Sequence, residues 1–166
     1  MQRESGFSLI ELLIVVAIIL VVAAIAVPNL LRARISSNEA SAAGSMRTIA
    51  TAELTYGLAY PTIGYADLAT LGGPANCVSS SVTACMIDSL LSTGTKSGYT
   101  FAATPSVAAG GPMDQYIITA VPVSLNITGV KGFCTVEDHV VLYITPAGVP
   151  ATRAICLGGT YNPIPN

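Results

Sequence analysis

One long apolar block near the N-terminus dominates the pattern of hydrophobic and polar positions. From Phe7 to Leu31 only Ser8, Glu11, Pro28 and Asn29 interrupt the apolar residues, and the 20 residues that follow Glu11 carry no charge. As a helix, those residues would extend roughly 30 Å, which is the thickness of a bilayer's hydrocarbon core. The pattern therefore predicts a membrane-spanning helix over residues 7–31.

A secretory signal peptide is the main alternative for this block. Ala24-Ile25-Ala26 has the small residues of a cleavage site, but the apolar part of a signal peptide usually has only about 7–15 residues. A plain membrane anchor explains the length better, yet it does not explain Glu11. A carboxylate within an apolar helix costs several kcal/mol unless it is paired or lies at the headgroup boundary.

The helix is expected to continue beyond the membrane and to pack on a globular head. Apolar residues at Ala42, Met46, Ala50 and Leu54 recur every fourth position, with Ile35 and Ile49 on the same stripe. We expect the long helix over residues 7–57. Pro28 should kink or locally melt it, and Gly44 should weaken it by about 1 kcal/mol relative to alanine.

The remaining part, residues 58–166, has the pattern of a small head built of short elements. Two short helices are expected, followed by an antiparallel sheet of about four strands against the long helix, which makes the fold class α+β. The expected helices are Tyr65–Leu71 and Ala84–Ser92, and the expected strands are Tyr99–Ala103, Gln115–Val121, Gly132–Val136 and Val140–Thr145.

Composition and charge narrow the function classes. The chain has 166 residues, of which 52% are apolar and only 10% charged, and its net charge is −2. Such a chain is neither a disordered tail nor a simple cytosolic enzyme. Without a run of Lys or Arg it shows no nucleic-acid site.

The residues around Glu11 resemble a known processing signal. The run Gly6-Phe7-Ser8-Leu9-Ile10-Glu11-Leu12-Leu13-Ile14-Val15 resembles the class III leader and cleavage motif of type IV pilins and pseudopilins, and Pro28 matches the helix-kinking proline of that family. The resemblance implies a type IV pilin-like fold. It also implies that a prepilin peptidase removes residues 1–6 and methylates the new amine of Phe7, and that Glu11 pairs with this amine on a neighbouring subunit. Two buried charges on neighbouring subunits can pair at only one axial register. Such a pair would therefore set the axial offset between the subunits.

Membrane orientation follows from the motif rather than from the flanking charges. Arg3 lies on one side of the apolar block, and Arg32 and Arg34 lie on the other. The number of basic residues on each side therefore does not predict which end of the helix is cytoplasmic. The resemblance implies a cytoplasmic leader on a single-pass inner-membrane precursor, and then an extracellular pilus or a periplasmic pseudopilus. The implied partners are the membrane before assembly, the prepilin peptidase, the inner-membrane assembly machinery and other copies of the chain in a filament.

The four cysteines, Cys77, Cys85, Cys134 and Cys156, all lie in the exported part, where disulfides are favoured. Three connectivities are possible, and sequential spacing favours Cys77–Cys85 with Cys134–Cys156. The second pair resembles the disulfide-bounded C-terminal loop of many type IV pilins. A zinc site is disfavoured because the chain has no Cys-x-x-Cys and a single histidine. We expect no metal and no cofactor.

Other candidate chemistry is weak. Glu137, Asp138 and His139 could suggest a site, but neighbouring strand residues point to opposite faces, and solvated turn charges are the simpler explanation. Asn126-Ile127-Thr128 fits a glycosylation sequon, a match that is common by chance. The tyrosines are expected to pack in the core or in grooves. No nucleophile or phosphate-loop motif occurs, so no enzyme is expected.

The sequence therefore favours a structural subunit of a type IV pilus. A pseudopilin of a type II secretion system is the nearest alternative, because the motif is shared. Major pseudopilins often have a C-terminal calcium site and usually lack cysteines, so four cysteines without an acidic cluster favour the pilin. A membrane-anchored binding domain that never polymerises is a second alternative. It predicts that Met1 is retained and Glu11 is dispensable.

Overall fold

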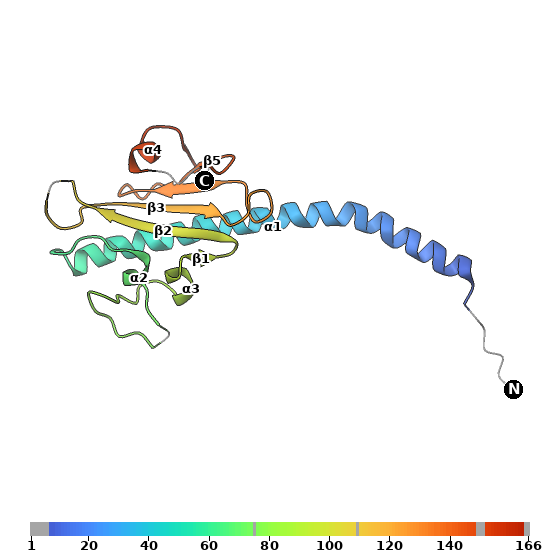
Figure 1. Cartoon of the computed structure of the whole chain (residues 1–166), viewed down its shortest axis with the longest axis horizontal. Coiled ribbons are helices and arrows are strands. Elements are labelled where there is room, and N and C mark those ends of the chain that lie inside the picture. Colours follow the sequence, from blue (N-terminus) through green and yellow to red (C-terminus); the bar gives the residue numbers. More distant parts are fainter. Residues whose placement is uncertain (1–6, 75, 109, 149–151, 165–166) are drawn as a thin grey trace. The chain divides into compact units, whose positions relative to one another are not determined.

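The structure is a computed structural model of the chain, and it describes residues 7–74, 76–108, 110–148 and 152–164. The chain divides into two compact units, Met1–Arg34 and Ile35–Asn166. The boundary falls within the long helix α1, which is Leu9–Ala59. Figure 1 shows the order of the elements along the chain.

The second unit combines the C-terminal part of α1 with one antiparallel sheet. The sheet has six strands in the sequential order β1 to β6, so each strand pairs with its neighbour along the chain. The elements after α1 are α2 (Leu68–Leu71), α3 (Ser89–Ser92), β1 (Thr95–Lys96), β2 (Tyr99–Ser106), β3 (Gln115–Pro122), β4 (Gly132–Thr135), β5 (Leu142–Ile144), α4 (Arg153–Leu157) and β6 (Asn162–Pro163). The expected α+β fold is confirmed, with six strands instead of about four. The two additional strands have only two residues each, too few to show an alternating pattern.

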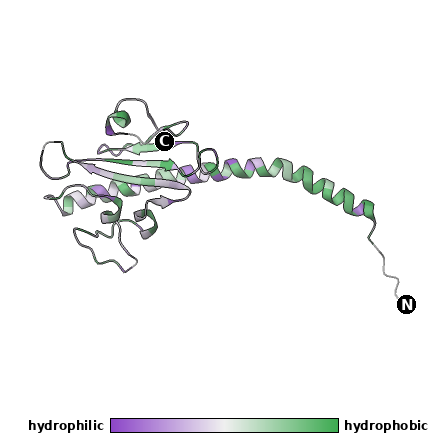
Figure 2. Ribbon diagram, in the orientation of Figure 1, coloured by the Kyte–Doolittle hydropathy of each residue, from purple (hydrophilic) through white to green (hydrophobic). Residues whose placement is uncertain are grey.

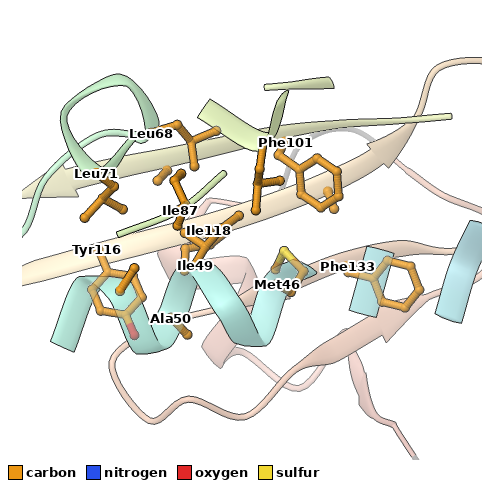
Figure 3. Close-up of a cluster of buried hydrophobic side chains, with 14 of the residues drawn as sticks. Met46, Ile49, Ala50, Leu68, Leu71, Ile87, Phe101, Tyr116, Ile118 and Phe133 are labelled. Carbon is orange, nitrogen blue, oxygen red and sulfur yellow. The ribbon is translucent and has the colours of Figure 1, made fainter. Parts of the chain in front are cut away.

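The main core lies between α1 and the sheet. Residues alternate between buried and exposed along β2, and Phe101 pairs with Ala120 of β3. This alternation follows from the two-residue period of a strand, which turns every second side chain toward α1. Met46, Ile49 and Ile118 meet there with Leu68 and Leu71 of α2 and with Ile87, which precedes α3 (Figure 3).

A second, smaller core lies on the opposite face of the sheet. It consists of the buried residues Cys134, Val136, Cys156 and Tyr161, which pack against Ile117, Leu142 and Ile144. Because Ile117 and Ile118 are consecutive in β3, they point to opposite faces. The short helix α4 covers this face (Figure 1). β4 is consequently buried throughout its length.

The two expected short helices are shorter than the sequence predicted, because a side-chain cap begins each one. Asp67 accepts a hydrogen bond from the backbone N–H of Thr70 and begins α2, and Asp88 accepts one from Leu91 and begins α3, both at 2.8 Å. Tyr65 lies outside α2, since its backbone N–H donates to Met113. The single-turn helix α4, capped by Thr152, was not predicted.

One expected core position on α1 is wrong. Leu54 is 45% exposed, whereas Glu53 is completely buried. A residue turns by about 100° per position in an α-helix. An every-fourth series therefore rotates away from its starting face, and by Leu54 it has left the face on which Ala42 lies. Glu53, eleven positions after Ala42, returns to that face.

Candidate functional site

The first unit presents an uncovered apolar helix. The large apolar side chains from Phe7 to Leu31 are exposed by between 42% and 79%. Among the described residues this is the one helix long and apolar enough to cross a membrane. Figure 2 shows the continuous hydrophobic colouring of this segment, with few polar residues along it. Such a surface requires lipid or other apolar helices around it.

Glu11 forms a local contact at the start of this helix. Its Oε2 accepts a hydrogen bond of 2.9 Å from the backbone N–H of Ser8, while the N–H of Glu11 donates to the Ser8 carbonyl at 3.1 Å. The side-chain contact is one half of a capping box, in which a glutamate three residues into a helix satisfies the N–H of the preceding cap residue. Sequence reasoning missed this role, although the Ser-x-x-Glu spacing signals it.

The other predicted positions of the N-terminal segment lie as follows. Gly6 is outside the described residues, and Phe7 is 79% exposed. α1 continues through Pro28, so the helix does not melt there in this structure. Gly44 also lies within the helix, and open space surrounds the position of a Cβ there.

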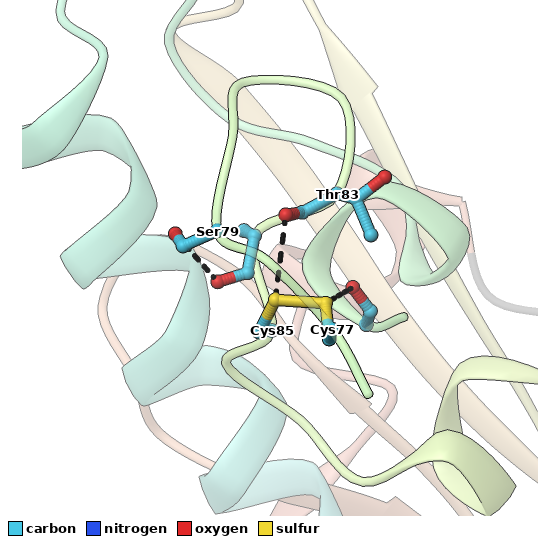
Figure 4. The surroundings of a disulfide bond; sticks show 6 residues. Cys77, Ser79, Thr83 and Cys85 are labelled. Atoms are coloured by element: carbon cyan, nitrogen blue, oxygen red, sulfur yellow. Dashed lines mark hydrogen bonds between the residues drawn. A yellow bond between two sulfur atoms is a disulfide. The ribbon is translucent and has the colours of Figure 1, made fainter. Parts of the chain in front are cut away.

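The four cysteines form two disulfides with the sequential connectivity. Cys77 bonds to Cys85 with a Cα–Cα distance of 5.9 Å, and Cys134 bonds to Cys156 with a distance of 6.2 Å. Figure 4 shows the first disulfide at the base of a small loop, where the Ser79 hydroxyl donates to the Ala84 carbonyl at 3.1 Å. The second disulfide joins β4 to α4 inside the smaller core.

Glu39 joins α1 to the segment between β3 and β4. One carboxylate oxygen accepts backbone hydrogen bonds from Val130 and Lys131 at 3.0 and 3.1 Å, and the other lies 3.1 Å from the Lys131 ammonium. The neighbouring Asn38 donates to the Thr128 carbonyl at 2.9 Å. These polar contacts fix the position of the sheet along the helix, a role that the sequence pattern did not indicate.

The group Glu137, Asp138 and His139 does not converge into one site. Asp138 and His139 are exposed in a turn, as expected of solvated charges, but Glu137 is half-buried and accepts the Tyr116 backbone N–H at 2.7 Å. Its carboxylate also binds the guanidinium of Arg153 on α4 at 3.0 Å. Although burial raises the pKa of Glu137, the bonds from Arg153 and the backbone outweigh it and hold the pKa below its usual value. The expectation of solvated charge was wrong for Glu137.

The tyrosines mainly fill the core. Tyr56, Tyr99, Tyr116 and Tyr161 are buried, and Tyr65 packs edge-on against Tyr116 with ring centroids 4.7 Å apart. Within the described ranges, no three His, Cys, Asp or Glu side chains gather in a way that could hold a metal ion. Asn126 of the sequon is exposed in the turn before β4.

Comparisons with known proteins point to the same segment. The family described as "Prokaryotic N-terminal methylation motif" matches residues 1–27. This chain carries that methylation motif. The resemblance of its N-terminal segment to type IV pilins is therefore confirmed.

Two curated relatives have pilin names. The type IV major pilin protein PilA of Myxococcus xanthus is 43% identical over 54 residues, which are 32% of this chain and 24% of that protein. The type IV wide pilus major component PilA4 of Thermus thermophilus is 56% identical over 39 residues, which are 24% of this chain and 30% of that protein. The alignments thus span only about a quarter to a third of the length of these relatives. No solved structure matches the chain.

Proposed function

We propose that this chain is the structural subunit of a type IV pilus. In this proposal, prepilin peptidase cleaves after Gly6, the new N-terminus at Phe7 is methylated, and the chain polymerises through its apolar helix. The observation that carries the proposal is an uncovered apolar helix beginning with the methylation motif, in the segment where relatives named as pilins are similar.

The physical chemistry of assembly is consistent with this role. A helix that leaves the bilayer for a bundle of equally apolar helices loses little hydrophobic stabilisation, because lipid tails and leucine side chains are similarly apolar. Cleavage after Gly6 creates an α-amine on Phe7, which is protonated at neutral pH because the pKa of such amines is near 8. Glu11 would pair with the amine of a neighbouring subunit and thereby select one axial register.

The implied location is a single-pass inner-membrane precursor, followed by an extracellular filament. Its proposed partners are other copies of the chain, the prepilin peptidase and the inner-membrane assembly machinery. A pseudopilin of a type II secretion system would share the processing and the helix but would remain in a periplasmic filament.

Fractionation of cells with intact-mass measurement tests the proposal. Sheared surface filaments and membranes are separated, and the mass of this chain is measured in both fractions. A surface species that begins at methylated Phe7 is expected. The same species confined to membranes would favour the pseudopilin, and a form that retains Met1 as the sole species would refute both assignments.

Substitution of Glu11 separates its capping contact from charge pairing. Glu11→Gln can still accept the Ser8 N–H, since glutamine also serves in a capping box, but it carries no charge. We expect Glu11→Gln, Glu11→Ala and Glu11→Lys to remain in the membrane and to give few or no filaments. A wild-type filament yield from Glu11→Gln would show that the charge is not needed for assembly.

A further inference from the structure

The most unusual group in the second unit is a buried carboxyl group. Glu53 lies on α1 and is 0% exposed. Its Oε2 accepts one hydrogen bond of 2.9 Å from the backbone N–H of Ala66, whereas its Oε1 has no hydrogen-bond partner among the described residues. A buried oxygen without a partner is costly in a neutral acid and much more costly in a carboxylate.

Among the described residues, no ion pair compensates Glu53. The three ion pairs found there join Lys96, Lys131 and Arg153 to other carboxylates. The titratable groups around it are Tyr56 of α1, then Tyr60, Tyr65 and Asp67 of the α1–α2 connection and Tyr116 of β3, with Asp114, Glu137, Asp138 and His139 beyond the tyrosines. Burial raises the pKa of Glu53 to about 7, the Asp67 charge adds to the rise, and the Ala66 hydrogen bond opposes it.

The residue that Glu53 binds, Ala66, belongs to the segment 60–66 that follows α1, and at the start of this segment the Tyr60 N–H donates to the Tyr56 carbonyl at 2.8 Å. Residues 60–66 pair with the β2–β3 loop, because Tyr65 N–H donates to the Met113 carbonyl and Met113 N–H donates to the Ile63 carbonyl, both at 2.8 Å. Among the described residues, the bond from the Ala66 N–H to Glu53 is the side-chain hydrogen bond that joins this segment to α1. The segment also lines an apolar groove with Leu54, Leu58 and Met113.

We propose that Glu53 is a pH-dependent clamp that holds residues 60–66 against α1 as a neutral acid and releases them when it ionises. An ionised Glu53 would need water or new partners, and the nearest way to obtain them is to separate Ala66 from the helix. Release would move one wall of the apolar groove, so the head surface there would differ between mildly acidic and alkaline conditions.

Amide hydrogen exchange on the full chain in detergent micelles tests this clamp. The readout is the protection factor of the Tyr65, Ala66 and Met113 amides, corrected for the intrinsic exchange rate at each pH. If the carboxyl pKa is about 7 when the segment is closed and 4.5 when it is open, protection should fall about 30-fold between about pH 5.5 and about pH 8.5.

Two glutamine variants make the test specific. Glu53→Gln keeps an acceptor for Ala66 but cannot ionise, so its protection should not depend on pH over this range. Glu39→Gln removes another carboxylate of α1 that accepts backbone hydrogen bonds. In this variant the protection of the amides should depend on pH as it does in the wild type. A flat wild-type profile, or an unchanged pH response in Glu53→Gln, would overturn the proposal.

A titration of the wild-type chain keeps the proposal testable if Glu53→Gln fails to fold. The side-chain carbonyl ¹³C shift of Glu53 should titrate with a midpoint near 7, together with a change in the Ala66 amide signal. A midpoint near the ordinary value of 4.5, or a titration that leaves Ala66 unchanged, would overturn it.

Discussion

Removing the two disulfides separately should destabilise the head by different amounts. In the loop-entropy description, stabilisation grows with the number of residues that a disulfide encloses. The Cys134–Cys156 disulfide spans 22 positions and the Cys77–Cys85 disulfide spans 8. These loops correspond to about 3.4 and about 2.5 kcal/mol, respectively.

Burial increases the difference. Cys134 and Cys156 are 0% and 1% exposed inside the smaller core, whereas Cys77 and Cys85 are only half-buried. Replacing the buried pair with alanine leaves a cavity, which costs of the order of 1 kcal/mol more. We therefore expect Cys134→Ala/Cys156→Ala to lose about 4–5 kcal/mol and Cys77→Ala/Cys85→Ala about 2–3 kcal/mol of the free energy of unfolding.

Chemical denaturation of the full chain in detergent micelles measures this difference. The chain has no tryptophan and seven tyrosines, so near-ultraviolet circular dichroism of tyrosine reports the loss of tertiary packing. Wild-type protein treated with a reductant is the control, and it should be at least as unstable as the less stable variant. An equal loss in the two variants, or a larger loss for Cys77→Ala/Cys85→Ala, would refute the reasoning from loop length and burial.

Three further predictions concern single residues. Gly44→Ala should raise the free energy of unfolding by about 0.5–1 kcal/mol in thermal or chemical denaturation, since alanine favours a helix and open space surrounds the position; a loss of stability would contradict this. Glu53 has a folded-state pKa above its unfolded value, so the wild type should lose about 3 kcal/mol of stability as pH rises from 4.5 to above 7, and Glu53→Gln should abolish this loss. Arg153→Ala should lower the free energy of unfolding by at most about 1 kcal/mol at neutral pH, because its ion pair with Glu137 is partly exposed. The pair stabilises the fold only while Glu137 is ionised, so this loss should become smaller in acid, as Glu137 is protonated.

The long apolar helix and the alternating strands could be predicted because their signals are local. An uninterrupted apolar run and a two-residue alternation are both visible in consecutive residues. Strands β2 and β3 begin at the predicted residues Tyr99 and Gln115. By contrast, β1, β6 and α4 have between two and five residues. Such short elements are defined by their tertiary partners, which the sequence does not display.

The polar ties of the head could not be predicted, because they join residues that are distant in the chain. Glu39 meets Val130, 91 positions away, and Glu137 meets Arg153, 16 positions away. In each case the carboxylate accepts backbone N–H groups as well as binding a cation. The residue type alone does not distinguish such a carboxylate from a solvated one, so only the folded arrangement gives it its role.

Glu11 and Glu53 lie on the same helix, but their environments are opposite. Glu11 is surrounded by apolar residues but is exposed near the helix start, where it binds Ser8. Glu53 lies in the half of the helix that packs on the sheet and is buried. Oε2 of Glu11 accepts the Ser8 N–H, and an ionised carboxylate has a second oxygen that can accept further hydrogen bonds. If Glu11 pairs with the amine of another subunit in a filament, this second oxygen can bind the amine while Oε2 keeps the cap. The cap would then hold the carboxylate in place for the pair, so the two contacts do not compete.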